Sequence, residues 1–585
     1  MFRSHILSEI NESLSDKKVT LSGFVNRRRD HGGLIFIDLR DRYGVVQLVF
    51  DPSESNEVHK LAESLRSEFV IKVQGGVRMR PESMFNPNLS SGKVEILVSD
   101  LTILSESKTP PFEIDSDDSV NEELRLKYRY LDLRRNRLKN NIIKRHQVIA
   151  DIRNILSKQD FLEIETPILI KGTPEGSREY LVPSRMYPGN YFVLPQSPQQ
   201  LKQLLMVASM DKYFQIARCF RDEDLRGDRQ PEFTQLDMEL SFVEMEDVIE
   251  LNTKLFKTLL QNHRPDLKFD GEVKSYTYDY VMNNYGSDKP DLRYELKFED
   301  ATEIFKESSF QAFSSVVKNG GIVKVLNVKG EASKFSRKVI SELESHAKIY
   351  KAKGLAYIIN DGGELKSPIL KFMSDNEIQK LKELVNFEDQ DIMFFAADEF
   401  DIACNSLGAV RIEVAKLLDL IDPELVSALW VTDFPMFEKD DEGNLQACHH
   451  PFTSPNLSDL ELLDSAPDKA TSQGYDLVMN GYEIAGGSVR IFNRELQAKI
   501  FDLLGISKED AQTRFGHILE AFEYGVPPHA GIAWGLDRFV MLLCDEPNIR
   551  EVIAFPKDQK AKDLMLGAPS EADSNTLKEL KIKNY

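Results

Sequence analysis

The chain has 585 residues, a formal net charge of −21, an apolar content of 41% and a charged content of 29%. This length exceeds what one hydrophobic core supports, so about three or four domains are expected. No segment approaches the roughly 20 apolar residues of a membrane span, which argues against a membrane protein. The negative charge argues against a protein that coats nucleic acid indiscriminately, although it is compatible with local basic patches.

Four cysteines are scattered through the chain without metal-ligand spacing, at positions 219, 404, 448 and 544. The N-terminal segment is polar and has no secretory apolar stretch. Neither disulfides nor structural zinc are therefore expected, and a reducing cytoplasm is the predicted location.

The first 105 residues are predicted to form a small β-barrel. Alternating apolar residues and turn residues predict five strands and one helix: Val19–Val25, Leu34–Leu39, Val45–Phe50, the helix Glu54–Arg66, Phe69–Arg80 and Lys93–Leu104. Three strands, a helix and two strands is the order of an OB-fold, whose sheet binds oligonucleotides.

Side-chain alternation in the first hairpin predicts which residues face outward. Ile35, Ile37 and Leu39 share one face as core residues, which leaves Phe36 on the other face. The same reasoning turns Gln47 outward, close to the basic segment Arg27–Arg29. An outward aromatic can stack on an unpaired base and an amide can contact a base edge. The alternative is that Phe36 packs under a loop.

Residues 106–141 are predicted to be a linker or hinge. Thr109, Pro110 and Pro111 interrupt regular structure. The segment Glu122–Asn136 then becomes helical and rich in arginine, which is equally typical of a solvated helix face. A longer amphipathic helix, Ile142–Lys158, and an extended segment that ends at Pro167 follow.

The most informative stretch is Phe220–Glu239, FRDEDLRGDRQPEFTQLDME. It places Arg221, Arg226 and Arg229 among several carboxylates, directly before a strand-like alternation. The planar guanidinium suits phosphate and carboxylate oxygens, so a strand could hold these arginines ready for a polyphosphate. A solvated charged loop is the alternative.

Residues 292–425 lack this arginine–carboxylate clustering and are predicted to be a separate α/β module. We expect the helices Phe298–Glu307, Phe335–Ala352 and Asp375–Val385 and the strands Ile322–Leu326, Leu355–Ile359 and Asp391–Ala396. Nothing in this segment indicates a function.

Charged motifs return after residue 425. His449 and His450 are adjacent but lack a third ligand, which favours substrate contact over zinc. A hairpin is predicted with Asn480-Gly481 at its turn, and it carries Asp476 and Glu483, hard oxygen ligands suited to magnesium beside phosphates. Downstream, Arg490 is a candidate carboxylate ligand. The segment 527–538 predicts a glycine-rich strand that leads into a helix beginning near Arg538.

Together these motifs resemble a known family. FRDED…RQPEF and GIAWGLDR resemble motifs 2 and 3 of the class II aminoacyl-tRNA synthetases, and the helix that ends in FLEIETP resembles their motif 1, which builds a dimer interface. TPEGSREY, QSPQQLKQ, HHPFT, NGYE and GGSVRI further resemble the aspartyl members. The N-terminal barrel and the insertion between motifs 2 and 3 resemble the bacterial type of these members. The similarity extends from residue 1 to about Pro569.

The resemblance implies an α+β multidomain protein: an OB-fold anticodon-binding domain (1–105), a linker (106–141), an antiparallel-sheet catalytic domain in two parts (142–291 and 426–585, the second with a C-terminal extension), and an inserted α/β domain (292–425). It implies a homodimer that activates L-aspartate with ATP and Mg²⁺, and transfers it to tRNA-Asp and, we predict, tRNA-Asn.

The resemblance also implies roles for individual residues. Aspartate would be bound by Glu175, Gln199, Lys202, Arg221, Asp237, His449 and Arg490. ATP would be bound by Arg221, Asp222, Glu223, Gln230, Phe233, Glu483, Gly535, Leu536, Asp537 and Arg538. Arg221, Arg538 and Glu483 would be catalytic, and Asp476 and Glu483 would hold the metal. The anticodon would meet Arg27, Arg28, Arg29, His31, Phe36, Gln47, Arg80, Ser83 and Glu95.

Some alternatives remain open. Members of this family either charge tRNA-Asp strictly or also charge tRNA-Asn. His31 and Ser83 lie where the two kinds differ, and a histidine at position 31 resembles the relaxed kind. A related asparaginyl or lysyl ligase is disfavoured by the insertion and by Arg490. A catalytically inactive nucleic-acid-binding relative is disfavoured by Arg221, Glu483 and Arg538.

Overall fold

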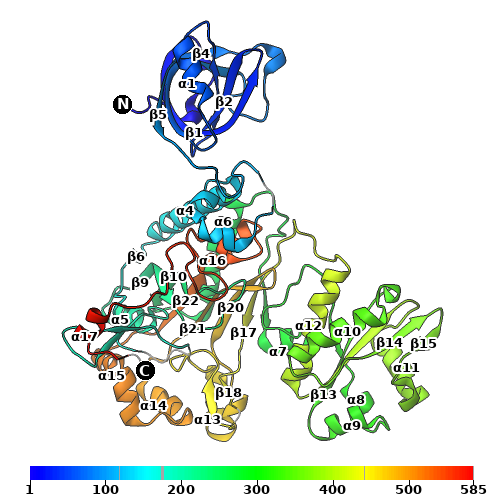
Figure 1. Ribbon diagram of the computed structural model, residues 1–585. Coiled ribbons are helices and arrows are strands. Elements are labelled where there is room, and N and C mark those ends of the chain that lie inside the picture. Colours follow the sequence, from blue (N-terminus) through cyan, green and yellow to red (C-terminus); the bar gives the residue numbers. More distant parts are fainter. Residues whose placement is uncertain (117–118, 173–176, 441, 584–585) are drawn as a thin grey trace. The chain divides into compact units, whose positions relative to one another are not determined.

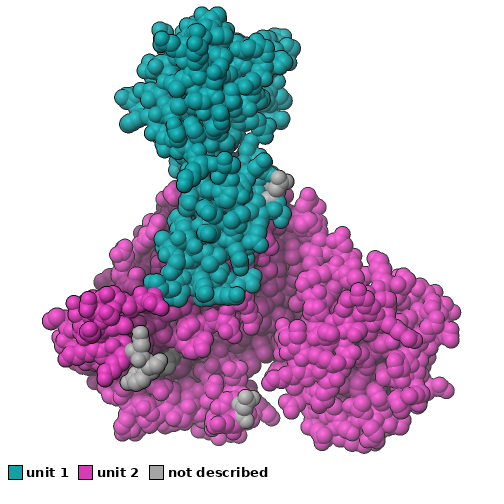
Figure 2. Space-filling view, in the orientation of Figure 1, with its two compact units in different colours: residues 1–142, 554–570 teal, residues 143–553, 571–585 magenta. Residues whose placement is uncertain are grey.

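A computed structural model describes residues 1–116, 119–172, 177–440 and 442–583. The chain forms two compact units, coloured separately in Figure 2. The first contains residues 1–142 and 554–570, and the second contains residues 143–553 and 571–585. No helix within the described ranges combines the length and the hydropathy that crossing a bilayer requires.

The first unit contains the predicted barrel. Its strands close in the order β1-β2-β3-β5-β4, with bounds β1 Lys18–His31, β2 Leu34–Arg40, β3 Val45–Phe50, β4 Val70–Met79 and β5 Val94–Ser105, and helix α1 Asn56–Glu63 lies between β3 and β4. The predicted OB-fold order is confirmed (Figure 1). Strand β1 is six residues longer at its C-terminal end than predicted, so Arg27–Arg29 belong to the sheet.

Register in the barrel follows the predicted alternation. Ile35, Ile37 and Leu39 are at most 3% exposed, whereas Phe36 is only partly buried and pairs with Val49 across β2 and β3. Phe36 therefore lies on the face opposite the core residues Ile35, Ile37 and Leu39, as the alternation predicts.

The arginine-rich segment before the long helix is not the solvated face that its composition left open. It forms α2 (Glu122–Lys127) and α3 (Arg129–Asp132), and Arg129 and Asp132 are only 2% and 1% exposed. Arg129 pairs with Asp132 at 2.9 Å and donates to the carbonyl of Ala554 at 2.9 Å. This segment therefore ties the chain after the barrel to residues 554–570 of the same unit.

The second unit is built on an eight-stranded sheet in the order β11-β17-β20-β21-β22-β10-β9-β6. Only the outermost pairs, β11 with β17 and β6 with β9, are parallel. The strands are β6 Leu162–Glu163, β9 Lys212–Phe220, β10 Glu232–Ser241, β11 Lys274–Thr277, β17 Ala428–Thr432, β20 Gly474–Met479, β21 Tyr482–Val489 and β22 His529–Gly535. An antiparallel centre rules out a Rossmann arrangement.

The two faces of this sheet differ because side chains alternate along each strand. Leu236, Met238 and Leu240 of β10 join a core with the long helices α4 (Asn136–Ser157), α6 (Met245–His263) and α16 (Leu536–Leu543). The intervening side chains of the same strand, Asp237 among them, point to the opposite face. That face therefore collects the polar residues of the unit.

Local turn chemistry fixes the hairpin β20–β21. Asn480 and Gly481 have φ values of 51° and 83°, the left-handed conformation that a two-residue hairpin turn needs. The predicted hairpin is confirmed, and it brings Asp476 directly opposite Gly486.

The inserted segment forms its own sheet in the order β12-β13-β16-β14-β15, all antiparallel (Figure 1). Its elements are β12 Phe298–Asp300, α8 Thr302–Phe305, α9 Gln311–Lys318, β13 Ile322–Val328, α10 Arg337–Ile349, β14 Ala356–Asp361, β15 Glu364–Lys366, α11 Asp375–Leu384, β16 Ile392–Asp398 and α12 Phe400–Leu417. The predicted helix Phe298–Glu307 is wrong, because Phe298 pairs with Leu326 as an edge strand and only one helical turn follows.

Shorter elements complete the second unit: β7 Leu181–Pro183, β8 Tyr191–Val193, α5 Gln199–Val207, α7 Tyr278–Tyr285, β18 Phe437–Lys439, β19 Leu445–Ala447, α13 Leu462–Ser465, α14 Arg494–Leu503, α15 Lys508–Ala521 and α17 Ser574–Glu579.

Candidate active site

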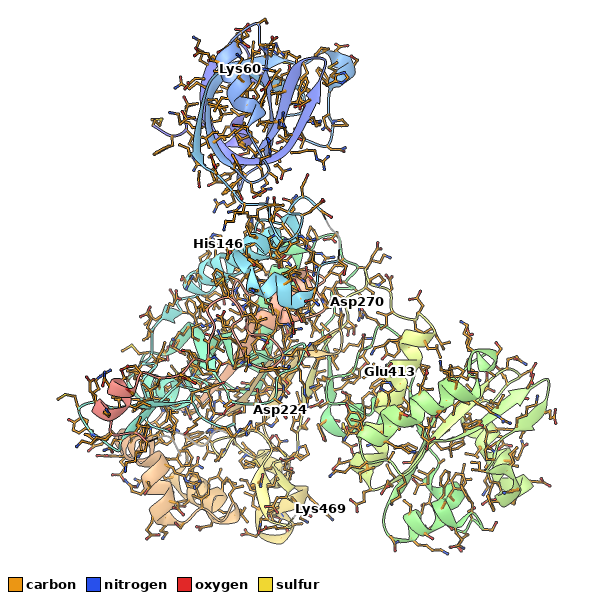
Figure 3. The ribbon with its side chains drawn as sticks, viewed as in Figure 1. Lys60, His146, Asp224, Asp270, Glu413 and Lys469 are labelled. Carbon is orange, nitrogen blue, oxygen red and sulfur yellow. The ribbon has the colours of Figure 1, made fainter. Side chains whose placement is uncertain are left out.

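A cavity of about 1220 Å³ opens on the polar face of the eight-stranded sheet. It is lined by most of the residues that the sequence singles out: Gln199, Lys202, Arg221, Glu223, Gln230, Phe233, Asp237, His449, Asp476, Glu483, Arg490, Gly535, Asp537 and Arg538. These residues come from α5, β10, β20, β21, β22, α16 and the connecting loops. Lys469, labelled in Figure 3, lies at the same cavity.

One end of the cavity carries a buried charge cluster around Glu239. Arg490 donates from Nε to Glu239 Oε1 at 2.9 Å and from a terminal nitrogen to Oε2 at 3.2 Å. The other terminal nitrogen donates to Ser488 Oγ at 2.6 Å. A guanidinium has five N–H donors, so two remain to bind a ligand.

Lys202 belongs to the same cluster. Its ammonium lies 2.9 Å from Asp237 and 3.2 Å from Glu239, and its side chain is 2% exposed. Among the described residues neither oxygen of Asp237 accepts a hydrogen bond of good geometry. Asp237 therefore has acceptor capacity left for a cationic or N–H group of a ligand.

The pKa values of the two carboxylates in this cluster are shifted in opposite directions. Burial would raise the pKa of Glu239, but Arg490 and Lys202 outweigh burial and bring the pKa to about 2. Burial dominates at Asp237 and raises its pKa, although Lys202 opposes the shift. Glu239 is thus a fixed anion that holds both cations at the cavity wall.

Glu239 is the main residue of the cluster to which sequence reasoning assigned no role, although the alternation of the strand includes it. It lies two positions after Asp237, so strand alternation already places it on the same face. Its role depends on Arg490, which lies 251 positions away in sequence. Strand alternation was the only sequence signal that could have indicated a role for Glu239.

A second group of residues forms the wider part of the cavity. The Arg221 guanidinium lies 5.1 Å from the centre of the Phe233 ring, and its Nε has no partner among the described residues. Arg538 pairs with Asp228 at 3.0 Å and donates to the Glu483 carbonyl at 3.0 Å. Arg221 and Arg538 therefore present cationic groups to one cavity, with an aromatic face beside them.

Three predicted contacts have side chains that are oriented or engaged differently from what the resemblance implies. Asp222 is exposed and does not line the cavity. Leu536 is fully buried in the apolar core. Asp537 accepts hydrogen bonds from the Thr234 backbone at 2.8 Å and from Arg145, so its carboxylate is engaged in anchoring the start of α16. Glu175 lies outside the described residues.

Asp476 and Glu483 converge where β20 and β21 pair. A Cβ built at Gly486 would lie 2.6 Å from Asp476 Oδ1 and 3.5 Å from Glu483 Oε1, so a side chain there would force the Asp476 carboxylate to shift. Burial, followed by repulsion from Glu483, raises the pKa of Asp476 to about 6. Two anions forced together in this way fit a divalent cation, which binds through one or two carboxylates and ligand phosphates.

His449 stands beside this pair. Its ring packs edge-on against Phe434 with centroids 4.6 Å apart, and Nε2 lies 3.9 Å from Asp476 Oδ1. Burial lowers the pKa of His449, but Asp476, Glu483 and Asp288 outweigh burial and raise it overall.

The barrel carries a separate polar cluster on its outward face. Arg29 donates to Gln47 at 3.2 Å, Gln47 donates to Glu95 at 2.8 Å, and Arg78 donates to Glu95 at 2.8 Å. Arg80 is buried and lies 3.9 Å from Glu95. Sequence reasoning missed Arg78 in this cluster.

The other barrel candidates lie around this cluster without joining it. Arg27 pairs with Asp115 and Arg28 with Asp30. His31 lines a smaller cavity of about 480 Å³. Ser83 is exposed in a short 3-10 turn, Glu82–Met84.

Comparison with known families gives two matches. Residues 121–559 match the family described as tRNA synthetases class II (D, K and N), and residues 19–104 match the OB-fold nucleic acid binding domain. The first match covers well over half of the chain. This chain belongs to the class II tRNA synthetases of the D, K and N family.

Individual relatives narrow the similarity further. The chain is 50% identical to the aspartate–tRNA(Asp/Asn) ligase of Syntrophomonas wolfei, covering 100% of this chain and 99% of the relative. It is 48% identical to the aspartate–tRNA(Asp/Asn) ligase of Bacillus subtilis over the whole of both chains. It is 49% identical to the aspartate–tRNA ligase of Staphylococcus carnosus, covering 98% of each.

A solved structure shares the fold at low identity. It is the asparaginyl-tRNA synthetase of Pyrococcus horikoshii with asparaginyl-adenylate, which has a TM-score of 0.59 and 19% identity and covers 95% of this chain and 98% of its own.

The carboxylate pair gives the first testable prediction. If Asp476 and Glu483 hold Mg²⁺, Gly486→Ala should displace the Asp476 carboxylate and raise the Mg²⁺ concentration needed for ATP–pyrophosphate exchange, with a loss of about 10- to 100-fold in kcat/KM for ATP. The matched control is Gly354→Ala, because a Cβ at position 354 would meet only Glu344 Oε1, at an ordinary contact distance of 3.7 Å. An unchanged magnesium requirement in Gly486→Ala would contradict the assignment of Asp476 and Glu483 as Mg²⁺ ligands.

Proposed function

We propose that this protein activates L-aspartate with ATP and transfers it to the 3′ end of tRNA. It is an aspartate–tRNA ligase, an aminoacyl-tRNA ligase that uses ATP. One observation carries the residue assignments: the acid-binding guanidinium of Arg490 and the phosphate-facing guanidinium groups of Arg221 and Arg538 line the same cavity.

The first step joins aspartate to the nucleotide. The substrate α-carboxylate is already ionised at neutral pH, so no general base has to create the nucleophile. It attacks the α-phosphorus of ATP, forming aspartyl-adenylate and releasing pyrophosphate. Arg221 stabilises the charge that develops on the α-phosphate, and Arg538 meets the γ-phosphate. In the second step the terminal ribose hydroxyl of tRNA attacks the adenylate carbonyl and AMP leaves.

Other residues position the nucleotide. The exposed face of Phe233 receives the adenine ring, and Glu223 and Gln230 lie beside the adenosine. Asp476 and Glu483 would hold Mg²⁺, which supplies positive charge next to the phosphates when bound. Asp222, Leu536 and Asp537 are not assigned side-chain contacts with ATP, because their side chains face solvent, the core and Arg145.

Selection of aspartate rests on the charge cluster. Arg490 keeps two free N–H donors for the substrate side-chain carboxylate, with Lys202 beside it. The neutral amide of asparagine would leave these cations poorly compensated in a buried site. Gln199, Asp237 and His449 complete the pocket.

The strongest test of this pocket is Arg490→Leu. We expect aspartate-dependent ATP–pyrophosphate exchange to fall by at least about 1,000-fold, because the variant loses the substrate contact and leaves Glu239 without its main partner. Arg494→Leu is the matched control, since Arg494 is an exposed arginine paired with Glu523. Near-normal exchange in Arg490→Leu would count against the assignment.

The barrel supplies the tRNA contacts in this proposal. Phe36 stacks on an unpaired anticodon base, and Gln47, held between Arg29 and Glu95, contacts a base edge. Arg27 and Arg28 meet the backbone. Arg80, Ser83 and Glu95 complete the anticodon set.

We infer that both tRNA-Asp and tRNA-Asn are charged, as the names of two relatives state for those proteins and as His31 suggests. Purified tRNA-Asn transcript should accept aspartate. His31→Ala should lower tRNA-Asn charging by about 10-fold relative to tRNA-Asp, the usual effect of one base contact. ATP–pyrophosphate exchange should not change. If the wild-type enzyme leaves tRNA-Asn uncharged, the enzyme is specific for tRNA-Asp.

A homodimer is also part of the proposal. Strand β6 is an edge of the large sheet, and the nearby chain exposes apolar side chains: Leu162, Ile168, Leu169, Leu181, Tyr191 and Phe192, each 40–60% exposed. The bridge between Ile170 and Val193 joins two parts of this patch. Exposed apolar surface at a sheet edge is a typical subunit interface.

The double variant Leu169→Asp/Leu181→Asp should convert the dimer to monomers in sedimentation velocity, because it places charges in the apolar contact. Leu457→Asp, at another exposed leucine, should leave the dimer intact. A wild-type protein that sediments as a monomer would refute the dimer.

A further inference from the structure

We propose that His450 is a specificity residue for the amino acid: its Nε2–H donates to the side-chain carboxylate of aspartate and thereby rejects asparagine. This inference rests on the proposed function, and it concerns a residue to which the resemblance gives no role. His450 lines the same cavity as Arg490 and Lys202.

The backbone places His450 beside Arg490. Residues 452–454 run along residues 489–491: Ile491 donates to the Phe452 carbonyl at 2.8 Å, Ser454 donates to the Val489 carbonyl at 2.9 Å, and Thr453 bridges to Arg490. The Thr453 N–H also donates to the His450 carbonyl at 2.9 Å, which closes the turn. The imidazole therefore belongs to the acid-binding end of the cavity.

Local hydrogen bonding fixes the tautomer of the ring. The Phe452 N–H donates to His450 Nδ1 at 3.2 Å, so Nδ1 is an acceptor and the proton of the neutral ring is on Nε2. The ring is also stacked on Phe452, with centroids 5.4 Å apart at 23°. Among the described residues Nε2 has no partner, and it is shielded from solvent.

The ring also stays neutral. Burial, with Arg490 and Lys202 adding to it, lowers the pKa of His450 to about 3. His450 therefore presents one N–H of fixed direction and no charge. A buried donor without a partner is costly, so a ligand that supplies an acceptor there is favoured.

The Nε2–H group of His450 discriminates against asparagine in a way that the two cations do not. Asparagine could satisfy Arg490 and Lys202 by turning its carbonyl oxygen toward them, which leaves its NH₂ group at the position of the second carboxylate oxygen. An N–H donor fixed at that position opposes the NH₂ group, donor against donor. Since Nδ1 is occupied by Phe452, the ring cannot switch to an acceptor. Asparagine is thus rejected by the repulsion between its NH₂ group and the His450 Nε2–H group, in addition to the attraction of the cations for aspartate.

The test compares aspartate- and asparagine-dependent ATP–pyrophosphate exchange in the full-length enzyme. His450→Leu removes the donor, and His450→Asn replaces it with an amide that can turn its oxygen toward the substrate. Both should lower kcat/KM for aspartate by about 10-fold, the effect of one lost hydrogen bond in a buried site. His450→Asn should also reduce the preference for aspartate over asparagine by about 10-fold or more. His146→Gln, at the exposed histidine on α4 labelled in Figure 3, should change neither value.

A second measurement observes the unmodified enzyme directly, and the His450→Asn variant serves only to assign the signal. ¹⁵N-histidine NMR of the unmodified enzyme should show one ring with unprotonated Nδ1, protonated Nε2 and no titration above pH 5, and this signal should disappear in His450→Asn. An Nδ1–H tautomer, or an unchanged amino-acid preference in both folded variants, would overturn the inference. Absence of aspartate-dependent exchange in the wild-type enzyme would instead refute the proposed function.

Discussion

The Glu239 carboxylate is the charge on which the acid-binding end of the cavity depends. Two cations taken from water into a closed pocket would repel each other and lose hydration. Glu239 receives hydrogen bonds from Arg490 and lies 3.2 Å from Lys202, which fixes both at the wall before any substrate arrives. The electrostatics of substrate binding are therefore set in advance, so little reorganisation is needed when the acid binds.

The antiparallel sheet turns this local cluster into a complete site. Because its strands alternate, one face packs against α4, α6 and α16 while the other carries carboxylates of the cavity, such as Asp237 and Asp476. Glycines make the close approaches possible. Gly486 leaves space for Asp476 and Glu483, and Gly531 leaves space for the Glu239 carboxylate. The same sheet therefore binds an acid at one end and phosphates at the other.

The inserted module is connected to this site through α7. The end of α7 at Gly286 meets α12 at Gly408, where neither position has space for a Cβ. Glu399 and Asp401, at the start of α12, line the cavity together with Asp279 of α7. The module therefore contributes to the wall of the cavity, although its sequence alone indicated no function.

The sequence by itself determined the features that depend on neighbouring residues. Strand alternation and turn residues gave the barrel order, the outward position of Phe36 and the hairpin at Asn480-Gly481. Most of the residues that the arginine and carboxylate motifs singled out line the cavity. Only the tertiary structure decided how these groups pair: Glu239 with Arg490, Asp228 with Arg538, and Arg129 with the carbonyl of Ala554. The tertiary structure also placed Asp222 at the surface, Leu536 in the core and Phe298 in an edge strand. Pairing and burial depend on residues hundreds of positions apart, whereas periodicity and turn chemistry are local.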